Sequence, residues 1–438
     1  MRTKSTATRR VIKFLGRLFE KGKAGWDYSD APDPGQSGKV KHSMGAILYA
    51  MELGLLSNQP TLRDVEQQTG MAEGLSKTLI PSSISDTTLD TEAQRLNSEY
   101  LHSKLIARVR YFHRSKMLEP YHLPCGVLTV DGKNLATLDH DANGSAQPRS
   151  KENEKWHPKD KDKGEPYFLM PALRATLTST AARPCVYQHL LPVGTGEATQ
   201  FKDFLAGLQK AYGRSQMFKI IEGDAGLTSL ENANLIMAAG YLYVFGLKGN
   251  QGELFTHAAS VLMSLAAGQP PEAQTMWERR NGKRIRRQLW RTGFLEGFEN
   301  TVGKWSHLRQ TWLVRQETES GGQITVEDRY FITAIDWHFL SPIQILLLVR
   351  NHWGVEVTFN SLDLQWREDS APWCTRGEAI PALGIIRLMA YNMAQIFRCC
   401  RLRGRKQDGT KSSPVTWRTT FKIIEHALQL NVECCTPG

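Results

Sequence analysis

The feature that most restricts the fold is the order of segments between residues 125 and 249. Runs rich in β-branched residues indicate strands, and apolar residues at a spacing of three to four indicate helices. The segments follow in this order: strands at 125–138, 166–180 and 185–193, a helix at 199–213, a strand at 217–226, a helix at 229–240 and a strand at 241–249. Alternating helices and strands favour parallel pairing of the later strands, so we predict an α/β fold with a mixed sheet.

The first 120 residues predict an all-helical region. Residues 42–56 carry apolar side chains at helical spacing, and a second short helix is expected to end at Gly70. After a loop, Ser85 or Asp86 is a suitable N-cap for the next helical segment. This pattern is compatible with a helix-turn-helix DNA reader and equally with a helical bundle that makes no DNA contact.

A strand-like pattern returns after the α/β segment. The dipeptide Asn281-Gly282, flanked by extended segments, predicts a hairpin. Ser341 then predicts the N-cap of one long helix that carries Glu356. We therefore divide the chain into a helical region (1–120), the first part of a core (121–252), a β-rich insertion (253–337), the second part of the core (338–402) and a C-terminal tail (403–438).

The charge of the chain favours a polyanionic partner. The formal net charge is +11, and nucleic acid is the commonest polyanion bound by such proteins. The seven cysteines show no spacing typical of zinc sites, and no segment approaches the roughly 18 to 20 apolar residues that a membrane span needs. We therefore expect a cytoplasmic protein with reduced thiols.

Three widely separated acids form the candidate active site. Asp131 and Asp224 are each expected at the end of an apolar strand, where α/β sheets commonly place functional groups. Glu356 is expected on a helix that shares one face with His352 and Asn360. A lone aspartate after a strand is more often a turn residue, so the indication comes from the set. Three carboxylates without a cysteine or histidine cluster suit Mg²⁺ or Mn²⁺, and two such ions can promote phosphodiester cleavage.

Basic and aromatic residues supply candidate DNA contacts. Lys133 and Lys248 lie within the predicted strands 125–138 and 241–249 and would offset the repulsion between the acids and DNA. Cations of the predicted hairpin would bind phosphates, and aromatic rings could stack on unpaired bases. The hairpin residues in question are Trp277, Arg279, Arg280, Lys283, Arg284, Arg286, Arg287, Trp290 and Arg291. The alternative is a solvated hairpin whose two tryptophans form a cross-strand pair.

Several of these segments resemble the DDE transposases of bacterial insertion sequences, in particular the IS-four-type and H-repeat-associated group. "TVDGKNL" resembles the block that carries the first aspartate, and "EGDAGLTSLENANLIMAAGYLYVFGLKGNQ" resembles the block that carries the second. "GTGEATQF" resembles the segment before the central helix, with Glu197 in the matching place. "VRNHWGVE" and "LDLQWREDS" resemble the block of the third acid. The resemblance covers roughly residues 40 to 400.

The resemblance implies an RNase H-like core in which Asp131, Asp224 and Glu356 bind two Mg²⁺ or Mn²⁺ ions. It implies cleavage and strand transfer at the ends of a mobile element, terminal inverted repeats and target DNA as partners, a homodimer on paired ends, and a bacterial, nucleoid-associated location. His352 would contact DNA near the third acid. The β-rich segment before Glu356 resembles the insertion found in this group.

The third block departs from the family pattern. Val357 follows Glu356 where asparagine is usual, and Val349 and His352 stand where one branch has tyrosine and arginine. Asp363 therefore competes with Glu356 as the third acid. Two alternative functions also stay open: an RNase H-like nuclease without strand transfer, and a sequence-specific DNA-binding protein whose catalytic centre has decayed.

Overall fold

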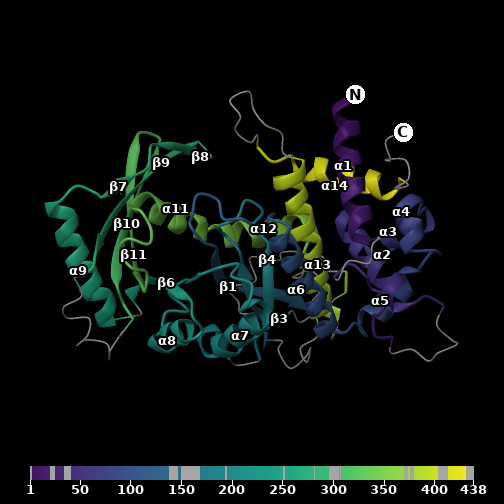
Figure 1. Cartoon of the computed structure of the whole chain (residues 1–438), viewed down its shortest axis with the longest axis horizontal. Helices are drawn as coiled ribbons and strands as arrows, with labels where there is room; N and C mark the ends of the chain where they lie inside the picture. Colours follow the sequence, from purple (N-terminus) through teal and green to yellow (C-terminus); the bar gives the residue numbers. More distant parts are fainter. Residues whose placement is uncertain are drawn as a thin grey trace.

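A computed structural model describes residues 2–19, 25–33, 41–137, 147–148, 168–192, 195–249, 252–280, 282–294, 305, 307–368, 373–374, 379–402 and 413–430. The helical region lies at one end of the molecule, the insertion at the other, and the α/β core between them (Figure 1). The first and last described helices, α1 (Arg2–Phe19) and α14 (Trp417–Leu428), both lie at the helical end (Figure 1).

The central part of the sheet has the strand order β4-β3-β1-β5-β6. Its strands are β1 (Val127–Thr137), β3 (Phe168–Thr176), β4 (Cys185–Leu190), β5 (Ile220–Gly223) and β6 (Leu242–Leu247), and the short β2 (Gln147–Pro148) pairs with β3. β1 pairs antiparallel with β3 and parallel with β5, and β5 pairs parallel with β6. This confirms the predicted mixed sheet with parallel later strands, and it is consistent with the RNase H-like core that the resemblance implies.

Helices α7 (Glu197–Tyr212) and α8 (Leu230–Ala238) lie next to each other beside this sheet (Figure 1). α7 buries Phe201, Phe204 and Leu208, whose spacing of three to four places them on one face of the helix. The Ser229 side chain accepts a hydrogen bond from the Asn232 N–H and so caps α8. These two helices connect β4 to β5 and β5 to β6, which allows the last two pairings to be parallel.

The insertion is not wholly β-rich, because it opens with a helix. It contains α9 (Gly252–Gly268), β7 (Ala273–Gln274), β8 (Glu278–Arg280), β9 (Lys283–Thr292), β10 (Gln310–Ser320) and β11 (Gln323–Thr333). Leu254, Ala258 and Leu262 are buried at helical spacing, and this pattern was missed in the sequence. β11 pairs antiparallel with β6, so the insertion extends the core sheet to eleven strands.

The predicted hairpin is confirmed between β8 and β9. Arg280 pairs with Lys283, and Gly282 has a φ of 77°, a value that glycine adopts at little cost. Asn281 lies outside the described residues.

The long helix predicted to carry Glu356 is two helices, α11 (Pro342–His352) and α12 (Gly354–Trp366), separated at Trp353. The predicted Ser341 cap is confirmed as a capping box. Glycine is a weak helix former, which favours a break beside Gly354. A Cβ on Gly354 would lie 3.0 Å from Cδ of Arg183, so the absence of a side chain lets Arg183 pack there.

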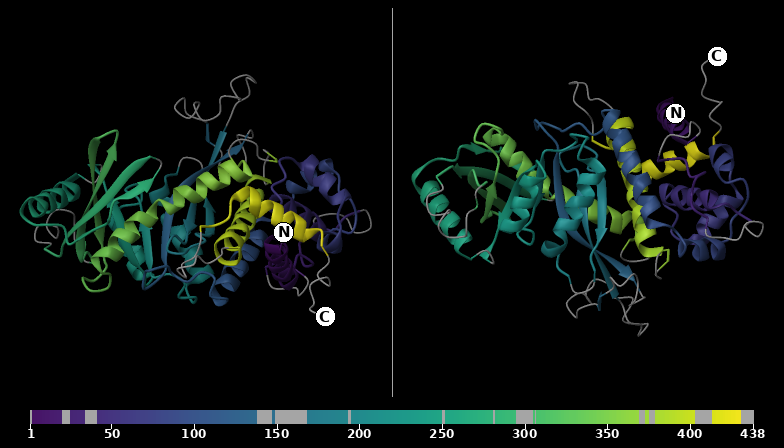
Figure 2. Two further views of the ribbon diagram at one scale, coloured as in Figure 1. Left: turned by 90° about the horizontal axis from the view of Figure 1, so that it is seen from above. Right: turned by 60° about the horizontal axis from the view of Figure 1, so that its bottom comes forward.

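The two helices run from the insertion across the core towards the helical region (Figure 2). α11 contacts β7 and β9 of the insertion, whereas α12 contacts β1 and β3 of the core. The break therefore lies where the two parts of the sheet meet, and it places the start of α12 beside β1.

The C-terminal segments correct two further expectations. α13 (Ala379–Ile396) continues into the π-helix η5 (Phe397–Arg401), and this helix is long and apolar enough to span a membrane. The sequence was expected to contain no such segment. Its apolar window is wholly buried inside the protein, as in the core helix of a globular domain. The expected tail includes α14 (Trp417–Leu428), which packs against α1 (Arg2–Phe19).

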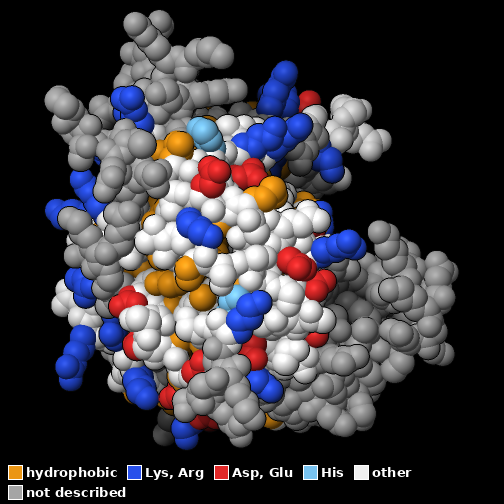
Figure 3. All heavy atoms as spheres, turned by 90° about the vertical axis from the view of Figure 1, so that its right-hand side faces the viewer, with side chains coloured by type: hydrophobic (Ala, Val, Ile, Leu, Met, Phe, Trp, Pro, Cys, Tyr) orange, Lys and Arg blue, Asp and Glu red, His pale blue; other side chains and the backbone are white. Residues whose placement is uncertain are grey.

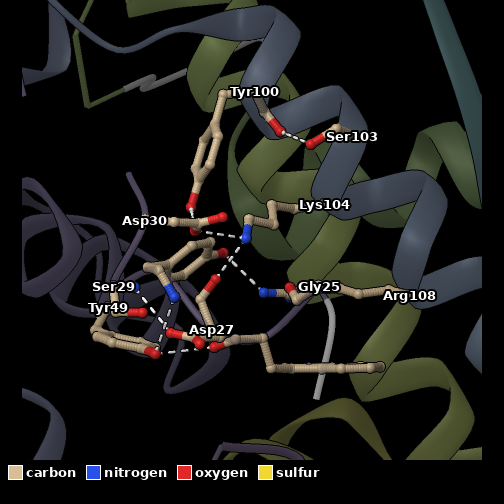
Figure 4. A network of polar contacts seen from close by, with 11 residues as sticks. Gly25, Asp27, Ser29, Asp30, Tyr49, Tyr100, Ser103, Lys104 and Arg108 are labelled. Carbon is tan, nitrogen blue, oxygen red and sulfur yellow. Dashed lines mark hydrogen bonds and ion pairs between the residues drawn. The ribbon is translucent and has the colours of Figure 1, made fainter. Parts of the chain in front are cut away.

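The helical region also contains α2 (Met44–Leu56), α3 (Leu62–Gly70), α4 (Gly74–Leu79), α5 (Asp86–Ala93) and α6 (Ser98–Arg114). Gly70 ends α3 and Ser85 caps α5, as predicted. A buried polar network ties α6 to the preceding chain: Arg108 of α6 is paired with Glu52 of α2, and its Nε donates to the Gly25 carbonyl (Figure 4). Lys104 adds an ion pair with Asp30 at 2.8 Å. Because an unpaired buried charge is costly, this network fixes the position of α6.

The surface at the helical end carries mixed charge. Lys and Arg are interspersed there with Asp, Glu and hydrophobic side chains (Figure 3). Among the described residues in this view there is no continuous basic stripe, so this face differs from the basic patches typical of DNA-reading surfaces.

Candidate active site

Asp131 lies within β1, not at its end as predicted. The parallel pairing of β1 with β5 stops at Val130, but β1 continues to Thr137 because it still pairs with β3. Asp131 is therefore the first residue beyond the parallel part of the strand. The Gly132 N–H donates a hydrogen bond of 2.8 Å to Asp131 Oδ1.

Asp224 directly follows β5, as predicted. Its Oδ1 accepts a hydrogen bond of 2.8 Å from the Gly226 N–H, an arrangement typical of an aspartate that begins a turn. Thr228 steadies the same turn by donating to the Gly246 carbonyl of β6 at 2.7 Å. Since β1 and β5 are parallel neighbours, Asp131 and Asp224 lie at the same edge of the sheet.

Glu356 lies in the first turn of α12 and is exposed, although the surrounding sequence is apolar. Its apolar neighbour Val355 is buried, so the helix turns its apolar side to the core and leaves the acid free to face outward. The amino end of a helix favours a negative side chain.

The three acids line one cavity of about 570 Å³. Burial and the charge of Asp224 raise the pKa of Asp131 to about 6, and Glu356 adds to the effect. Among the described residues, no group of three His, Cys, Asp or Glu side chains is arranged closely enough to hold one metal ion. Two ions shared between the three acids do not require such a group, because each ion could take its protein ligands from two of them.

His352 also lines this cavity, and a buried acid lies behind it. Its Nδ1 is 3.4 Å from Oε1 of Glu222, whose other oxygen accepts a hydrogen bond of 3.1 Å from Thr129. Burial alone would lower the pKa of His352, but the charges of Glu222 and Asp131 outweigh burial and raise it. The neighbouring acids therefore favour the protonated form of the imidazole at the edge of the acidic site.

Glu197 is a fourth acid near Asp131 that was not among the three acids predicted to form the site. It begins α7, and burial together with the charges of Asp131 and Asp224 raises its pKa to about 7. Its place in "GTGEATQF" matched the family pattern, but no spacing rule connects a helix start with two strand ends far along the chain.

Asp363, the competing third acid, does not line the cavity of the other acids. Both of its carboxylate oxygens accept hydrogen bonds from Lys133, at 2.8 and 2.9 Å. The Lys133 side chain is 9% exposed, so this predicted DNA contact is held largely inside the protein. Lys248, the other predicted basic neighbour, is exposed and lines the cavity.

Apart from Arg287, which is buried, the predicted hairpin cations fall into two sets. Arg284, Arg286 and Arg291 form ion pairs with Glu319, Glu317 and Glu272, respectively. The second set surrounds the turn and is exposed: Arg279, Arg280 and Lys283. Among the described residues, no ion-pair or hydrogen-bond partner contacts these three side chains.

The two hairpin tryptophans are in different environments and do not pair. Trp290 is buried and donates its indole N–H to the Gln269 carbonyl at 3.0 Å. Trp277 lies under the guanidinium groups of Arg284 and Arg286, at 5.1 and 4.9 Å from its ring centroid. The cross-strand tryptophan pair considered from the sequence is therefore absent from the described hairpin.

A second basic group surrounds Trp353. It could not be predicted from sequence patterns because its members are far apart in the chain. The guanidinium groups of Arg329 and Arg287 lie 4.1 and 5.7 Å from the Trp353 ring centroid. Arg287 is 5% exposed, and its Nε has no hydrogen-bond partner among the described residues. Burial and the charge of Arg350 lower the pKa of Arg287. Trp353 and Arg329 both line the acidic cavity.

The comparison with known families agrees with this geometry. A family model for the transposase DDE domain matches residues 127–393, which is more than half of the chain and includes Asp131, Asp224 and Glu356. No curated protein matches the chain in sequence.

Proposed function

The chain belongs to the DDE transposases, and on this premise we propose that it cuts DNA at the ends of a mobile element and transfers the freed strands to a target. The observation that carries the proposal is the meeting of Asp131, Asp224 and Glu356, from three separate elements, in one cavity within the matched domain. An acidic cavity in a basic protein suits metal-dependent work on a polyanion.

The residues present fit divalent cations. Asp131, Asp224 and Glu356 would hold two Mg²⁺ or Mn²⁺ ions, because carboxylate oxygens are the ligands that these ions prefer. Such ions would activate the attacking hydroxyl and stabilise the leaving oxygen of a phosphodiester. The raised pKa of Asp131 supports this assignment, because cations would relieve the repulsion that raises it.

The protein's own cations would hold the DNA backbone beside these acids. Arg287 and Arg329 lie beside the Trp353 ring, and the charge of Arg350 acts on Arg287. Glu327 is paired with Arg329 and Glu278 with Arg350, so these two acids offset only part of the positive charge. An incoming phosphate would provide the missing negative charge. His352 would add a positive charge at the cavity edge, and Lys248 a further one.

The hairpin would extend this contact along the DNA. Arg279, Arg280 and Lys283 project from the turn between β8 and β9 and are exposed. Exposed cations without carboxylate partners gain most from phosphate contact, because they give up no existing ion pair. Trp277, Arg284, Arg286 and Arg291 would then shape the hairpin, and buried Trp290 would support it from behind.

The oligomeric state and the roles of the other regions follow from the proposed reaction. Pairing two element ends requires two active sites, so we assign the working form as a homodimer on terminal inverted repeats. The helical region (residues 1–120) would read those repeats. As divided from the sequence, residues 121–252 and 338–402 would form the catalytic core, and residues 253–337 the insertion that holds the flanking DNA.

The test is cleavage and joining of a duplex that carries an end of the element encoding this chain. The expected result is nicking at the element end with Mg²⁺ or Mn²⁺, none with EDTA, and joined products when target DNA is present. Cleavage without joining would favour an RNase H-like nuclease. Binding of the end without cleavage under either ion would favour a decayed DNA-binding protein. Asp224→Asn is the matched inactive control.

A further inference from the structure

Helix α12, which carries Glu356, needs contacts of its own to fix its position. Helix α11 packs against β7 and β9 of the insertion, whereas α12 packs against β1 and β3 of the core. One unbroken helix would carry a fixed orientation from the insertion to the core, but the separation at Trp353 weakens that link. The place of Glu356 therefore depends on how α12 is held on the core sheet.

Two ion pairs fasten α12 to strands β1 and β3. Both carboxylate oxygens of Asp363 accept hydrogen bonds from Nζ of Lys133, at 2.8 and 2.9 Å. Glu368, just beyond the end of α12, accepts a hydrogen bond of 2.7 Å on each oxygen from the guanidinium group of Arg174. Lys133 is largely buried, and Arg174 and Glu368 are almost fully buried, so water and salt screen these pairs only weakly.

The two cations lie on the face of the sheet that presents Asp131. Lys133 follows Asp131 by two residues in β1, and Arg174 is directly opposite Asp131 in β3. Alternate residues of a strand, and residues directly opposite each other in neighbouring strands, point to the same face. The ion pairs therefore join α12 to the same patch of sheet from which Asp131 reaches the cavity.

The spacing along α12 connects the ion pair of Asp363 to the position of Glu356. Asp363 follows Glu356 by seven residues, which is close to two full turns of an α-helix. The two acids therefore lie on one side of α12, about 10 Å apart along its axis. Because a two-turn segment of helix is stiff, a contact that holds Asp363 on β1 also restricts Glu356.

We propose that Lys133 and Asp363 are positioning residues, whose ion pair sets where α12 lies on the sheet and so where Glu356 meets Asp131. This role rests on the proposed metal-dependent function, in which Glu356 and Asp131 act together. It gives one shared task to a lysine predicted as a DNA contact and an acid predicted as a competitor for the third place. The alternative is an ion pair that only stabilises the fold.

The two roles respond differently to removal of both charges. Removing one partner leaves a buried charge unpaired and destabilises a fold, whereas replacing both by apolar side chains of similar volume is often neutral or stabilising. Lys133→Met and Asp363→Leu are such replacements. If the pair only stabilises the fold, the double variant should behave as the unaltered protein, whereas a positioning pair would still be missing from it.

The first measurement is made on the full chain without metal or DNA. We expect the melting temperature of the double variant to match that of the unaltered chain. Hydrogen exchange of the backbone amides in α12 should become about tenfold faster, because the helix has lost one of its anchors and opens locally more often. Exchange in α7 should not change.

The second measurement is single-turnover nicking of an element end at saturating DNA with Mg²⁺. A misplacement of about 1 Å can cost about 100-fold in rate, so the double variant should nick about tenfold or more slowly with unchanged affinity for the DNA. Asp363→Asn keeps an oxygen that can accept a hydrogen bond from Lys133, so it should retain most of the rate. The control is Lys202→Met with Asp203→Leu, the same two changes at exposed residues of α7.

Nicking at the unaltered rate by the double variant would overturn the positioning role and leave the proposed function standing. Equal slowing by the control would overturn the positioning role as well. If the double variant does not fold, Lys133→Gln replaces it as the milder change, and an unaltered rate in that variant would count in the same way. If the unaltered protein does not nick, the proposed function fails, and the positioning role fails with it.

Discussion

Replacing Asp131 by asparagine should stabilise the metal-free protein. Asp131 has a pKa raised from 3.8 to about 6, first by burial and then by the charge of Asp224. A tenfold change in a protonation equilibrium corresponds to about 1.4 kcal/mol, so the charged side chain lowers the free energy of unfolding by about 3 kcal/mol at neutral pH. Asparagine removes the charge, and its carbonyl oxygen can still accept the hydrogen bond from Gly132.

The gain in stability of Asp131→Asn should grow as the pH rises. Above about pH 6 Asp131 is charged in both the folded and the unfolded protein, and the fold carries the full penalty. As the pH falls through 6, the folded protein takes up the proton first and the penalty shrinks; it is gone below 3.8. The advantage of Asp131→Asn is therefore expected at pH 7.5 and not at pH 4.

The assay is thermal and denaturant unfolding in EDTA and in Mn²⁺. Asp131→Asn should be more stable than the unaltered chain in EDTA at pH 7.5, and the order should reverse at saturating Mn²⁺, because only the unaltered site binds the ion. Asp336→Asn serves as control, since its side chain is 84% exposed and surface changes have small effects. Equal or lower stability of Asp131→Asn in EDTA at pH 7.5 would refute the reasoning.

Two further predictions concern DNA contact and the core. Arg280→Ala and Lys283→Ala should each reduce the slope of log DNA affinity against log salt concentration by about one. Arg284→Ala removes a cation that is already paired with Glu319, so it should change the slope less. Equal effects of all three variants in a salt titration would contradict the proposed DNA contact at the hairpin turn. Arg174→Ala should lower the free energy of unfolding by about 3 to 5 kcal/mol, because it leaves buried Glu368 unpaired; a loss below about 1 kcal/mol in denaturant unfolding would contradict this role.

The fold was predictable where local patterns are strong. Asn281-Gly282, Ser341 and Ser85 each give a local signal, and the hairpin and the caps appear where these signals predicted them. The break at Trp353 was not predictable, because it depends on Arg183 packing beside Gly354 from a distant part of the chain.

The candidate site was predictable only in part, for the same physical reason. Asp131 and Asp224 follow apolar runs of buried strand, which sequence shows directly. Glu197 lies against Gly132, the residue after Asp131, a fact of packing that no spacing rule contains. The pairing of Asp363 with Lys133 likewise joins residues from β1 and α12 that only the folded chain brings together.

The hairpin shows how composition alone can overestimate a binding surface. A dense run of arginines in the sequence suggested a uniform DNA contact. In the fold, Arg284 and Arg286 point to the same face of the sheet, where they are neutralised by Glu319 and Glu317, the residues directly opposite them on β10. Because strand pairing decides which charges are neutralised, only the cations at the turn stay exposed and unpaired among the hairpin residues that the structure describes.

The most direct test of the central claim is Mg²⁺-dependent nicking of an element end by Glu356→Gln and Asp363→Asn, measured in parallel with DNA binding. Glu356 lines the cavity with Asp131 and Asp224, whereas Asp363 is bound to Lys133 outside it. The account predicts that Glu356→Gln binds DNA but does not nick it, and that Asp363→Asn still nicks. Nicking by Glu356→Gln, together with its loss in Asp363→Asn, would contradict the assignment of the third acid.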